Sequence, residues 1–242
     1  MGAQPRPAFY ALPAGGWRDL VTLLHPPYTA WHLSYVAIGA ALAPHFHGGR
    51  MLATLAGFFL GVGLCAHALD ELNGRPLQTQ LSTRLLTAIA VVSLLGAIAI
   101  GAYGAAAVSA TLALFILFGV FLLLAYNLEL FGGRLHNDIA FALAWGAFPV
   151  LTAYWASALA IRPAALAGAG GCFALSLAQR RLSTPARELR RRTVSVLGEQ
   201  RLRDGTVRPL SAMSIQGPLE GALRACAASV VLLAVALVAA RL

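Results

Sequence analysis

Long apolar runs separated by short polar connections organise the chain. Seven such runs lie at about residues 28–44, 51–70, 85–102, 105–125, 137–160, 163–178 and 223–240. Each is close to the roughly 20 residues that an α-helix needs to cross a bilayer. The pattern therefore predicts an all-α fold, a polytopic helical membrane bundle of about seven transmembrane helices.

The first polar segment, residues 1–27, is expected to lie at the membrane surface. Within it, the stretch WRDLVTLL places Trp17, Leu20 and Leu24 on one helical face before Pro26 and Pro27 interrupt the helix. This pattern is typical of an interfacial helix. The six apolar runs that follow, within residues 28–178, are predicted to form a six-helix transmembrane core.

A second polar segment, residues 179–222, is predicted to be an arginine-rich cytoplasmic loop, followed by a C-terminal transmembrane helix at 223–242. Inside the loop, TPARELRRRTVSVLGEQRL indicates a helix with Thr184 as its cap, Pro185 at its first position and Gly198 as its stop. The sequence DGT at 204–206 predicts a turn.

Composition agrees with a membrane protein and excludes other classes. Hydrophobic residues make up 59% of the 242 residues and charged residues only 11%, and the mean hydropathy is +0.73. These values exclude a two-domain soluble enzyme and a nucleic-acid reader, although the net charge is +9.

The distribution of charge predicts the orientation. All 18 basic residues are arginines. Most lie in the N-terminal segment and in the connections after the second, fourth and sixth runs, whereas the opposite side holds only Arg50, Arg162 and Arg241. By the positive-inside rule, the N-terminus and the 179–222 loop face the cytoplasm, and the localisation is a bacterial-type inner (plasma) membrane.

The stretch LCAHALDELNGRPLQTQLSTR, at the end of the second run, carries the first candidate chemistry. His67, Asp70, Glu71 and Gly74 occur at i, i+3, i+4 and i+7, so they share one helical face. Two carboxylates beside an imidazole suit a divalent metal or a metal diphosphate, for which Mg²⁺ is the candidate ion. Alternatively, the two acids only end the helix in the head-group region and pair with Arg75.

Further polar residues are expected on the same side of the membrane, where they are available to an anion. Arg75 and Arg84 follow the first cluster, and Arg180 and Arg181 begin the arginine-rich segment. The stretch AYNLELFGGRLHND contributes Tyr126, Arg134 and Asn137, although Asn137 or Asp138 is equally suited to cap the fifth helix. We expect Asp70, Tyr126 and Arg180 to face one shared cavity.

Aromatic residues recur on one face of the first run. Tyr28, Trp31, His32 and Tyr35 occur at i, i+3, i+4 and i+7. This spacing is typical of an aromatic belt at the membrane interface, and the same rings are also suited to stack against an isoprenoid cation.

Over residues 18–190 the chain resembles the UbiA superfamily of membrane prenyltransferases. LVTLLHPPYTAWHLSYVAIGAALAP is similar to the opening of that family, and AYNLELFGGRLHNDIAFALAWGAFPVLTAYW to its tyrosine-containing loop and fifth span. CAHALDELNGRPLQT occupies the place of the first aspartate-rich motif, NDxxDxxxD, of which Asp70 is retained while Ala66, His67 and Gly74 replace the other three positions.

The second aspartate-rich motif has a different counterpart in this chain. At its place, SLAQRRLSTPARELRRR offers Glu188 among six arginines and a glutamine. The chain also has seven predicted spans where the family usually has nine.

The resemblance implies an enzyme that binds an isoprenoid diphosphate through Mg²⁺ and transfers the prenyl group. Asp70, Glu71 and Tyr126 are then the catalytic candidates, and His67, Asp70 and Glu71 the metal ligands. The candidates for substrate binding are Arg75, Arg84, Arg134, Asn137, Arg180 and Arg181. Guanidinium groups suit phosphate oxygens, so arginines can take over part of the neutralisation.

The alternative hypothesis is a non-catalytic membrane protein that binds a polyprenyl lipid or an anionic lipid, because an arginine-rich segment is attracted to an anionic leaflet equally well.

Overall fold

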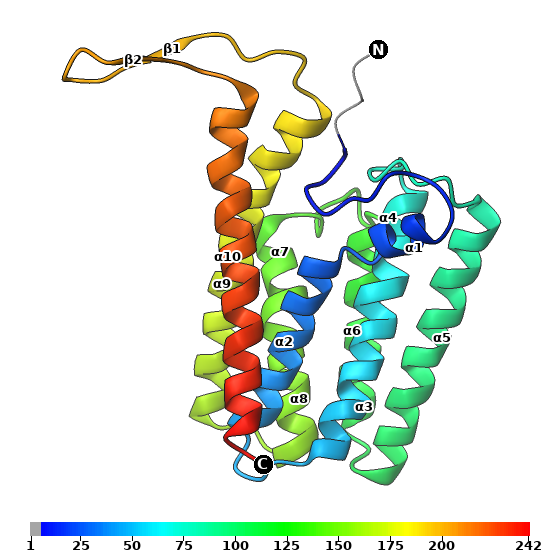
Figure 1. The fold of residues 1–242 in the computed structure, drawn as a ribbon. Coiled ribbons are helices and arrows are strands. Elements are labelled where there is room, and N and C mark those ends of the chain that lie inside the picture. Colours follow the sequence, from blue (N-terminus) through cyan, green and yellow to red (C-terminus); the bar gives the residue numbers. More distant parts are fainter. Residues whose placement is uncertain (1–5) are drawn as a thin grey trace.

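The structure, a computed structural model, describes residues 6–242 as a bundle of long helices with one small β-hairpin (Figure 1). The elements are α1 (Trp17–Leu23), α2 (Pro26–Leu42), α3 (Gly48–Phe58), η1 (Phe59–Ala66), α4 (His67–Leu72), α5 (Thr83–Ala107), α6 (Leu112–Asn127), α7 (Asp138–Ala142), η2 (Leu143–Ala147), α8 (Phe148–Ala158), α9 (Pro163–Arg191), β1 (Glu199–Arg201), β2 (Val207–Pro209) and α10 (Ala212–Ala239).

Four of the helices in residues 6–242 are long and apolar enough to cross a membrane. They are Gly48–Leu72, Thr83–Ala107, Asp138–Ala158 and Ala212–Ala239, and Leu112–Asn127 is a shorter apolar helix. On α5, large apolar side chains such as Val92 and Leu95 are more than half exposed, as is expected of a surface that faces lipid. The mostly helical fold and these helices indicate a membrane protein.

Two of these long helices contain a segment of π-helix. Gly48–Leu72 consists of α3, η1 and α4, and Asp138–Ala158 consists of α7, η2 and α8. A π-helical turn widens the helix and is often found at functional sites. In η2, a Cβ atom at Gly146 would lie 2.7 Å from the carbonyl oxygen of Cys172, so only glycine permits α9 to approach this closely.

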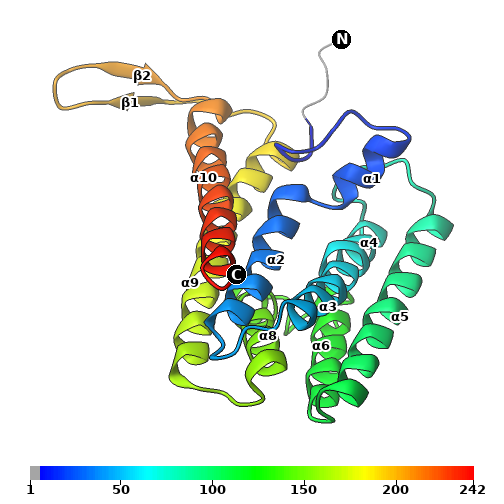
Figure 2. The same cartoon turned by 60° about the horizontal axis from the view of Figure 1, so that its bottom comes forward.

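Helix α2 is the centre of the bundle. It packs against α8 and α10, and Figure 2 shows it between the α9–α10 pair and α3. Trp31, Tyr35 and Val150 are fully buried in the cluster that these helices share. A Cβ atom at Gly39 would lie 2.3 Å from the carbonyl oxygen of Val150, so the α2–α8 contact requires glycine there.

The arginine-rich segment is largely helical, and the bounds of its helices differ from those expected within residues 179–222. Helix α9 continues without a break to Arg191, and α10 already begins at Ala212. The helix predicted to begin at Thr184 and to end near Gly198 is wrong, because Pro185 lies inside α9. The longer helix is held from the side: Nη2 of Arg190 donates a hydrogen bond to Oε2 of Glu220 on α10 at 2.7 Å.

The connection between α9 and α10 carries the hairpin. Strands β1 and β2 pair antiparallel, with Gln200 opposite Arg208. The predicted turn at residues 204–206 is confirmed: the amide of Thr206 donates to Oδ1 of Asp204 at 2.9 Å, and Gly205 has a φ of +86°.

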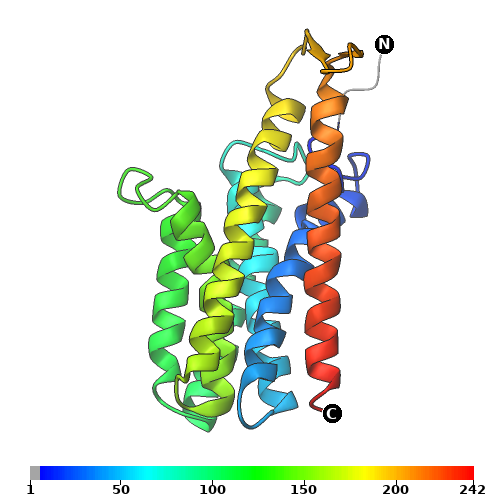
Figure 3. The same cartoon turned by 90° about the vertical axis from the view of Figure 1, so that its left-hand side faces the viewer.

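Several polar segments lie at the same end of the bundle. In Figure 3, α9 and α10 run side by side and extend beyond the other helices toward the hairpin, and the C-terminus lies at the opposite end. The N-terminal segment, the end of α4, the α6–α7 connection and the hairpin all lie at the upper end of Figure 1. The polar groups that the sequence predicts to act together are therefore gathered at one end of the bundle.

Candidate functional site

A cavity of about 390 Å³ opens at this end of the bundle. Its wall comes from the N-terminal segment, α2, η1, α4 and the loop that follows it, α6, the α6–α7 connection, α7, η2, α9 and α10. The lining includes ten aromatic or imidazole rings and five arginines, namely Phe9, Tyr10, His25, Tyr28, His32, His67, Tyr126, His136, Phe141, Trp145, Arg180, Arg187, Arg190, Arg191 and Arg192.

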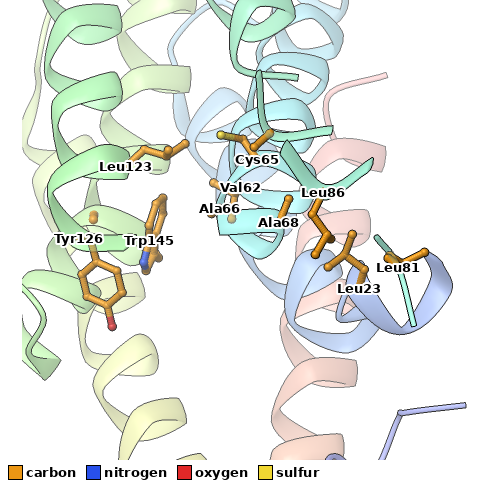
Figure 4. Close-up of a cluster of buried hydrophobic side chains, with 12 residues drawn as sticks. Leu23, Val62, Cys65, Ala66, Ala68, Leu81, Leu86, Leu123, Tyr126 and Trp145 are labelled. Carbon is orange, nitrogen blue, oxygen red and sulfur yellow. The ribbon is translucent and has the colours of Figure 1, made fainter. Parts of the chain in front are cut away.

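Three residues predicted to meet do line this one cavity. Asp70 comes from α4, Tyr126 from α6 and Arg180 from α9. Figure 4 shows Tyr126 and Trp145 on neighbouring helices, with Trp145 facing Val62 and Ala66 of η1. The expectation that these three residues face one cavity is confirmed, although they lie on helices and not in the connecting loops.

The lining arginines differ in whether a carboxylate already neutralises them. Nε of Arg180 donates to Oδ1 of Asp138 at 2.9 Å, and Arg190 pairs with Glu220. None of the ion pairs found within residues 6–242 includes Arg187 or Arg191. Among the described residues, Arg187 donates a hydrogen bond to the hydroxyl of Thr184, and Arg191 donates one to the carbonyl of Pro7. Arg192, which also lines the cavity, takes part in no ion pair within residues 6–242 either, but it is exposed. Arg187 and Arg191 are therefore the partly buried cations available to an anionic ligand.

Glu71 has a structural role that the sequence does not reveal. Its carboxylate is fully buried and accepts three hydrogen bonds, from the amide of Leu77 at 2.9 Å and from the amide and the hydroxyl of Thr79 at 2.8 Å each. The carboxylate therefore binds the loop after α4 and not a metal or a substrate. Glu71 does not line the cavity. This corrects its assignment as a catalytic residue and a metal ligand.

The predicted set of metal ligands is not assembled. In the part of the chain that the structure describes, no group of three His, Cys, Asp or Glu side chains could hold a metal ion. Nδ1 of His67 lies 3.1 Å from the carbonyl oxygen of Gly63. Asp70 alone fits Mg²⁺, since this ion often takes one or two protein carboxylates together with substrate phosphates.

Five of the six predicted substrate-binding residues lie outside the cavity lining. Arg75 braces the loop after α4, donating to the carbonyl of Leu81 at 2.6 Å and to the hydroxyl of Thr83 at 3.1 Å.

Asn137 caps α7 through Oδ1, which accepts from the amide of Ala140 at 2.9 Å, so the capping alternative is the correct one. The remaining three are exposed on the surface: Arg84, Arg134 and Arg181.

Some lining residues have no clear signal in the sequence. Tyr10 belongs to an irregular segment without periodicity, yet its ring packs on His25 and Tyr28. Burial, together with the nearby Tyr28, raises the pKa of Tyr10. Burial and the positive groups around it lower the pKa of His25 well below 6.5. His136 stacks on Tyr126 with ring centres 4.4 Å apart.

A second space, an apolar groove of about 520 Å³, lies between α3, α5, α6 and α8. It extends toward the opposite end of the bundle, where Arg50 and Tyr103 line it. Val62 and Trp145 line both the groove and the arginine-lined cavity. The carbonyl of Trp145 lies 3.0 Å from Nδ1 of His32, which holds η2 against α2 at this junction.

Comparison of the chain with protein-family models, curated proteins and solved structures found no match.

Proposed function

We propose that the protein is a UbiA-like membrane prenyltransferase that binds an isoprenoid diphosphate. The diphosphate lies in the arginine-lined cavity and the isoprenoid chain in the apolar groove. The seven long helical segments each cross the bacterial inner membrane, and the N-terminus and the arginine-rich end of the bundle face the cytoplasm.

The observation that carries this proposal is the junction of the two spaces. A polar cavity and an apolar groove that share Val62 and Trp145 match a ligand whose charged head is joined directly to an apolar chain. A soluble phosphate compound would leave the groove empty, and a neutral hydrocarbon would not interact with the arginines. The combination therefore favours an amphiphile with an anionic head.

The charges around the cavity favour a phosphate head in particular. Arg187 and Arg191, which lack an ion pair among the described residues, offer planar groups with several N–H donors each. Such donors neutralise a diphosphate as the allylic C–O bond breaks and the diphosphate leaves. The ring of Trp145 at the junction, with that of Tyr126 beside it, then stabilises the allylic cation until the acceptor atom forms the new bond to carbon and gives up its proton to the released diphosphate.

Asp70 is the residue proposed to work with a metal. Of the carboxylates that line the cavity, Glu129 lies near His136 and Glu220 pairs with Arg190, whereas Asp70 takes part in no ion pair within residues 6–242. Mg²⁺, when bound, would supply further neutralisation of the diphosphate. Asp70 would be its protein ligand.

The second candidate function is non-catalytic binding of a polyprenyl lipid or an anionic lipid. The lining arginines without an ion pair favour it, because they attract any phosphate head without a metal. Metal dependence separates the two candidates: the enzyme requires Mg²⁺ at Asp70 for full affinity, and the binder does not.

The experiment measures binding of farnesyl diphosphate to the protein in lipid nanodiscs, with and without Mg²⁺. Loss of a hydrogen bond to a charged group costs about 1.5–3 kcal/mol, so Arg187→Gln should weaken binding about 10-fold to 100-fold. Arg181→Gln is the matched control, because Arg181 lies on the same helix but is exposed.

Equal affinities of the two arginine variants would contradict the proposed site. Asp70→Asn should remove only the part of the affinity that Mg²⁺ adds. If wild-type binding is strong but independent of Mg²⁺, and no inorganic diphosphate is released when candidate acceptors are added, the non-catalytic function is favoured instead.

A further inference from the structure

Gln179 on α9 is a buried amide in the wall of the cavity. Its side chain lines the cavity, and the residue is only 3% exposed. Within residues 6–242, its Oε1 atom has no hydrogen-bond partner. Buried amide oxygens normally accept a hydrogen bond, because leaving one without a donor destabilises the folded protein. Oε1 of Gln179 is thus suited to accept a hydrogen bond from an O–H or N–H group of a ligand.

The position of Gln179 differs from that of the arginines. Gln179, Ser183 and Arg187 occur at i, i+4 and i+8 on α9 and all line the cavity. With a rise of 1.5 Å per residue, Gln179 lies about 12 Å deeper along the helix axis than Arg187. The face of α9 therefore presents a cation near the cytoplasmic end and a neutral acceptor closer to the membrane interior.

The deeper position coincides with the junction between cavity and groove. Ser176, one turn from Gln179 on the side away from Arg187, packs against η2, where a Cβ atom at Gly146 would lie 2.7 Å from its Oγ. Gly146 is the neighbour of Trp145, which lines both spaces. A ligand group that reaches Gln179 is therefore close to the bond between the diphosphate and the chain.

We propose that Gln179 forms a second subsite, which binds a neutral hydroxyl or N–H group at the junction of the arginine-lined cavity and the apolar groove. The inference rests on the proposed function and deepens it: it assigns a hydroxyl-bearing or amine-bearing acceptor to the position where the prenyl group is released. Gln179 accepts the hydrogen bond and orients the group. It takes up no proton, because an amide is not a base at neutral pH, and the acceptor's proton goes to the released diphosphate.

The test compares farnesol with farnesyl methyl ether, which has the same chain but no donor. Wild-type protein in nanodiscs should bind farnesol at least about 5-fold more tightly than the ether, the ratio expected for one neutral hydrogen bond. Gln179→Leu should abolish this preference and leave the affinity for farnesyl diphosphate within about 2-fold. Gln200→Leu, on the exposed strand β1, is the control and should keep the preference.

The stability of the ligand-free protein is a second readout. Because the amide oxygen has no partner, Gln179→Leu should keep or raise the midpoint of thermal unfolding. A preference for farnesol that is missing in the wild type or that persists in Gln179→Leu overturns the subsite, as does a clear fall in the midpoint.

Failure of the subsite and failure of the proposed function give different results. If wild-type protein binds farnesyl diphosphate but does not distinguish farnesol from the ether, only the subsite is wrong. If it does not bind farnesyl diphosphate but shows a preference for farnesol that depends on Gln179, only the proposed function is wrong. Binding of none of the three probes contradicts both.

Discussion

The imidazole rings of His25 and His67 stack face to face, with their centres 4.0 Å apart and their planes inclined by 13°. His25 lies at the start of α2 and His67 at the start of α4, so the stack joins two helices at the wall of the cavity. Tyr10 of the N-terminal segment packs on His25 as well. This aromatic stack connects three parts of the chain that are distant in sequence.

The stack predicts that the protein is less stable in acid. The pKa of His25 is well below 6.5 in the folded protein, because the ring is withdrawn from water and lies near positive groups. The unfolded chain takes up a proton near pH 6.5, which the folded chain does not. The free energy of unfolding should therefore fall as the pH drops below about 6.5, by up to roughly 1.4 kcal/mol per pH unit for this residue.

His25→Asn tests this expectation, since His25 has a φ of +46° and asparagine tolerates that left-handed backbone. The midpoint of thermal unfolding, measured in nanodiscs between pH 7.5 and 5.5, should fall less in the variant than in the wild type. An equal fall in both proteins would show that other groups cause the acid sensitivity.

Glu71 and Asp70 should respond differently to the loss of charge, although they are neighbours. Glu71→Gln leaves the donors of Leu77 and Thr79 without a carboxylate and should lower the free energy of unfolding by about 1–3 kcal/mol. The Asp70 carboxylate makes no ion pair among the described residues, so Asp70→Asn should leave the free energy of unfolding unchanged or raise it.

Denaturant unfolding of the two variants in the same detergent measures this difference. A larger loss of stability in Asp70→Asn than in Glu71→Gln would contradict the role assigned to Glu71.

The groove predicts a dependence on chain length. Gly57 lines the groove five residues before Val62, at a point where an added Cβ meets only Ile100 at 3.9 Å. Gly57→Leu should therefore fit without unfolding the protein and should block the deeper part of the groove. We expect binding of geranylgeranyl diphosphate to weaken by about 10-fold, since several CH₂ groups worth about 0.8 kcal/mol each lose their contacts.

Binding of geranyl diphosphate, whose chain is half as long, is the internal control and should remain within about 2-fold of the wild type. If both diphosphates weaken equally in Gly57→Leu, the chain does not follow this groove.

The proposed topology predicts that the hairpin and the α2–α3 connection lie on opposite sides of the membrane. Single cysteines at Gln200 and at His47, in a background without Cys65, Cys172 and Cys226, should be labelled from opposite sides by an impermeant thiol reagent. In intact cells, the cysteine at position 47 should react and that at position 200 should not. Labelling of both positions from the same side would refute the topology.

The sequence alone determined the helical class of the protein. In a membrane, long apolar runs satisfy the hydrogen bonds of their backbone by forming helices. Four of the predicted runs correspond to helices that are long and apolar enough to span the membrane. The turn at Asp204 and the cap at Asn137 were also predictable, because both depend on hydrogen bonds to neighbours a few residues away.

The sequence also predicted that Asp70, Tyr126 and Arg180 meet in one cavity, because the segments that carry them were expected on one side of the membrane. The helical continuation of α9 past Pro185 was not predictable from local rules. A proline at the expected first position of a helix looks the same in sequence whether a helix begins there or passes through. Packing against α10 and the Arg190–Glu220 pair decided between these possibilities.

Only the tertiary structure decided which polar residues serve the site. The helical spacing places Glu71 beside Asp70, but the amides of Leu77 and Thr79 return along the loop and occupy its carboxylate. Likewise, Arg181 and Arg187 look alike in the sequence, yet only Arg187 lines the cavity. The side chains are alike in chemistry, and contacts between distant segments determine which of them a ligand can reach.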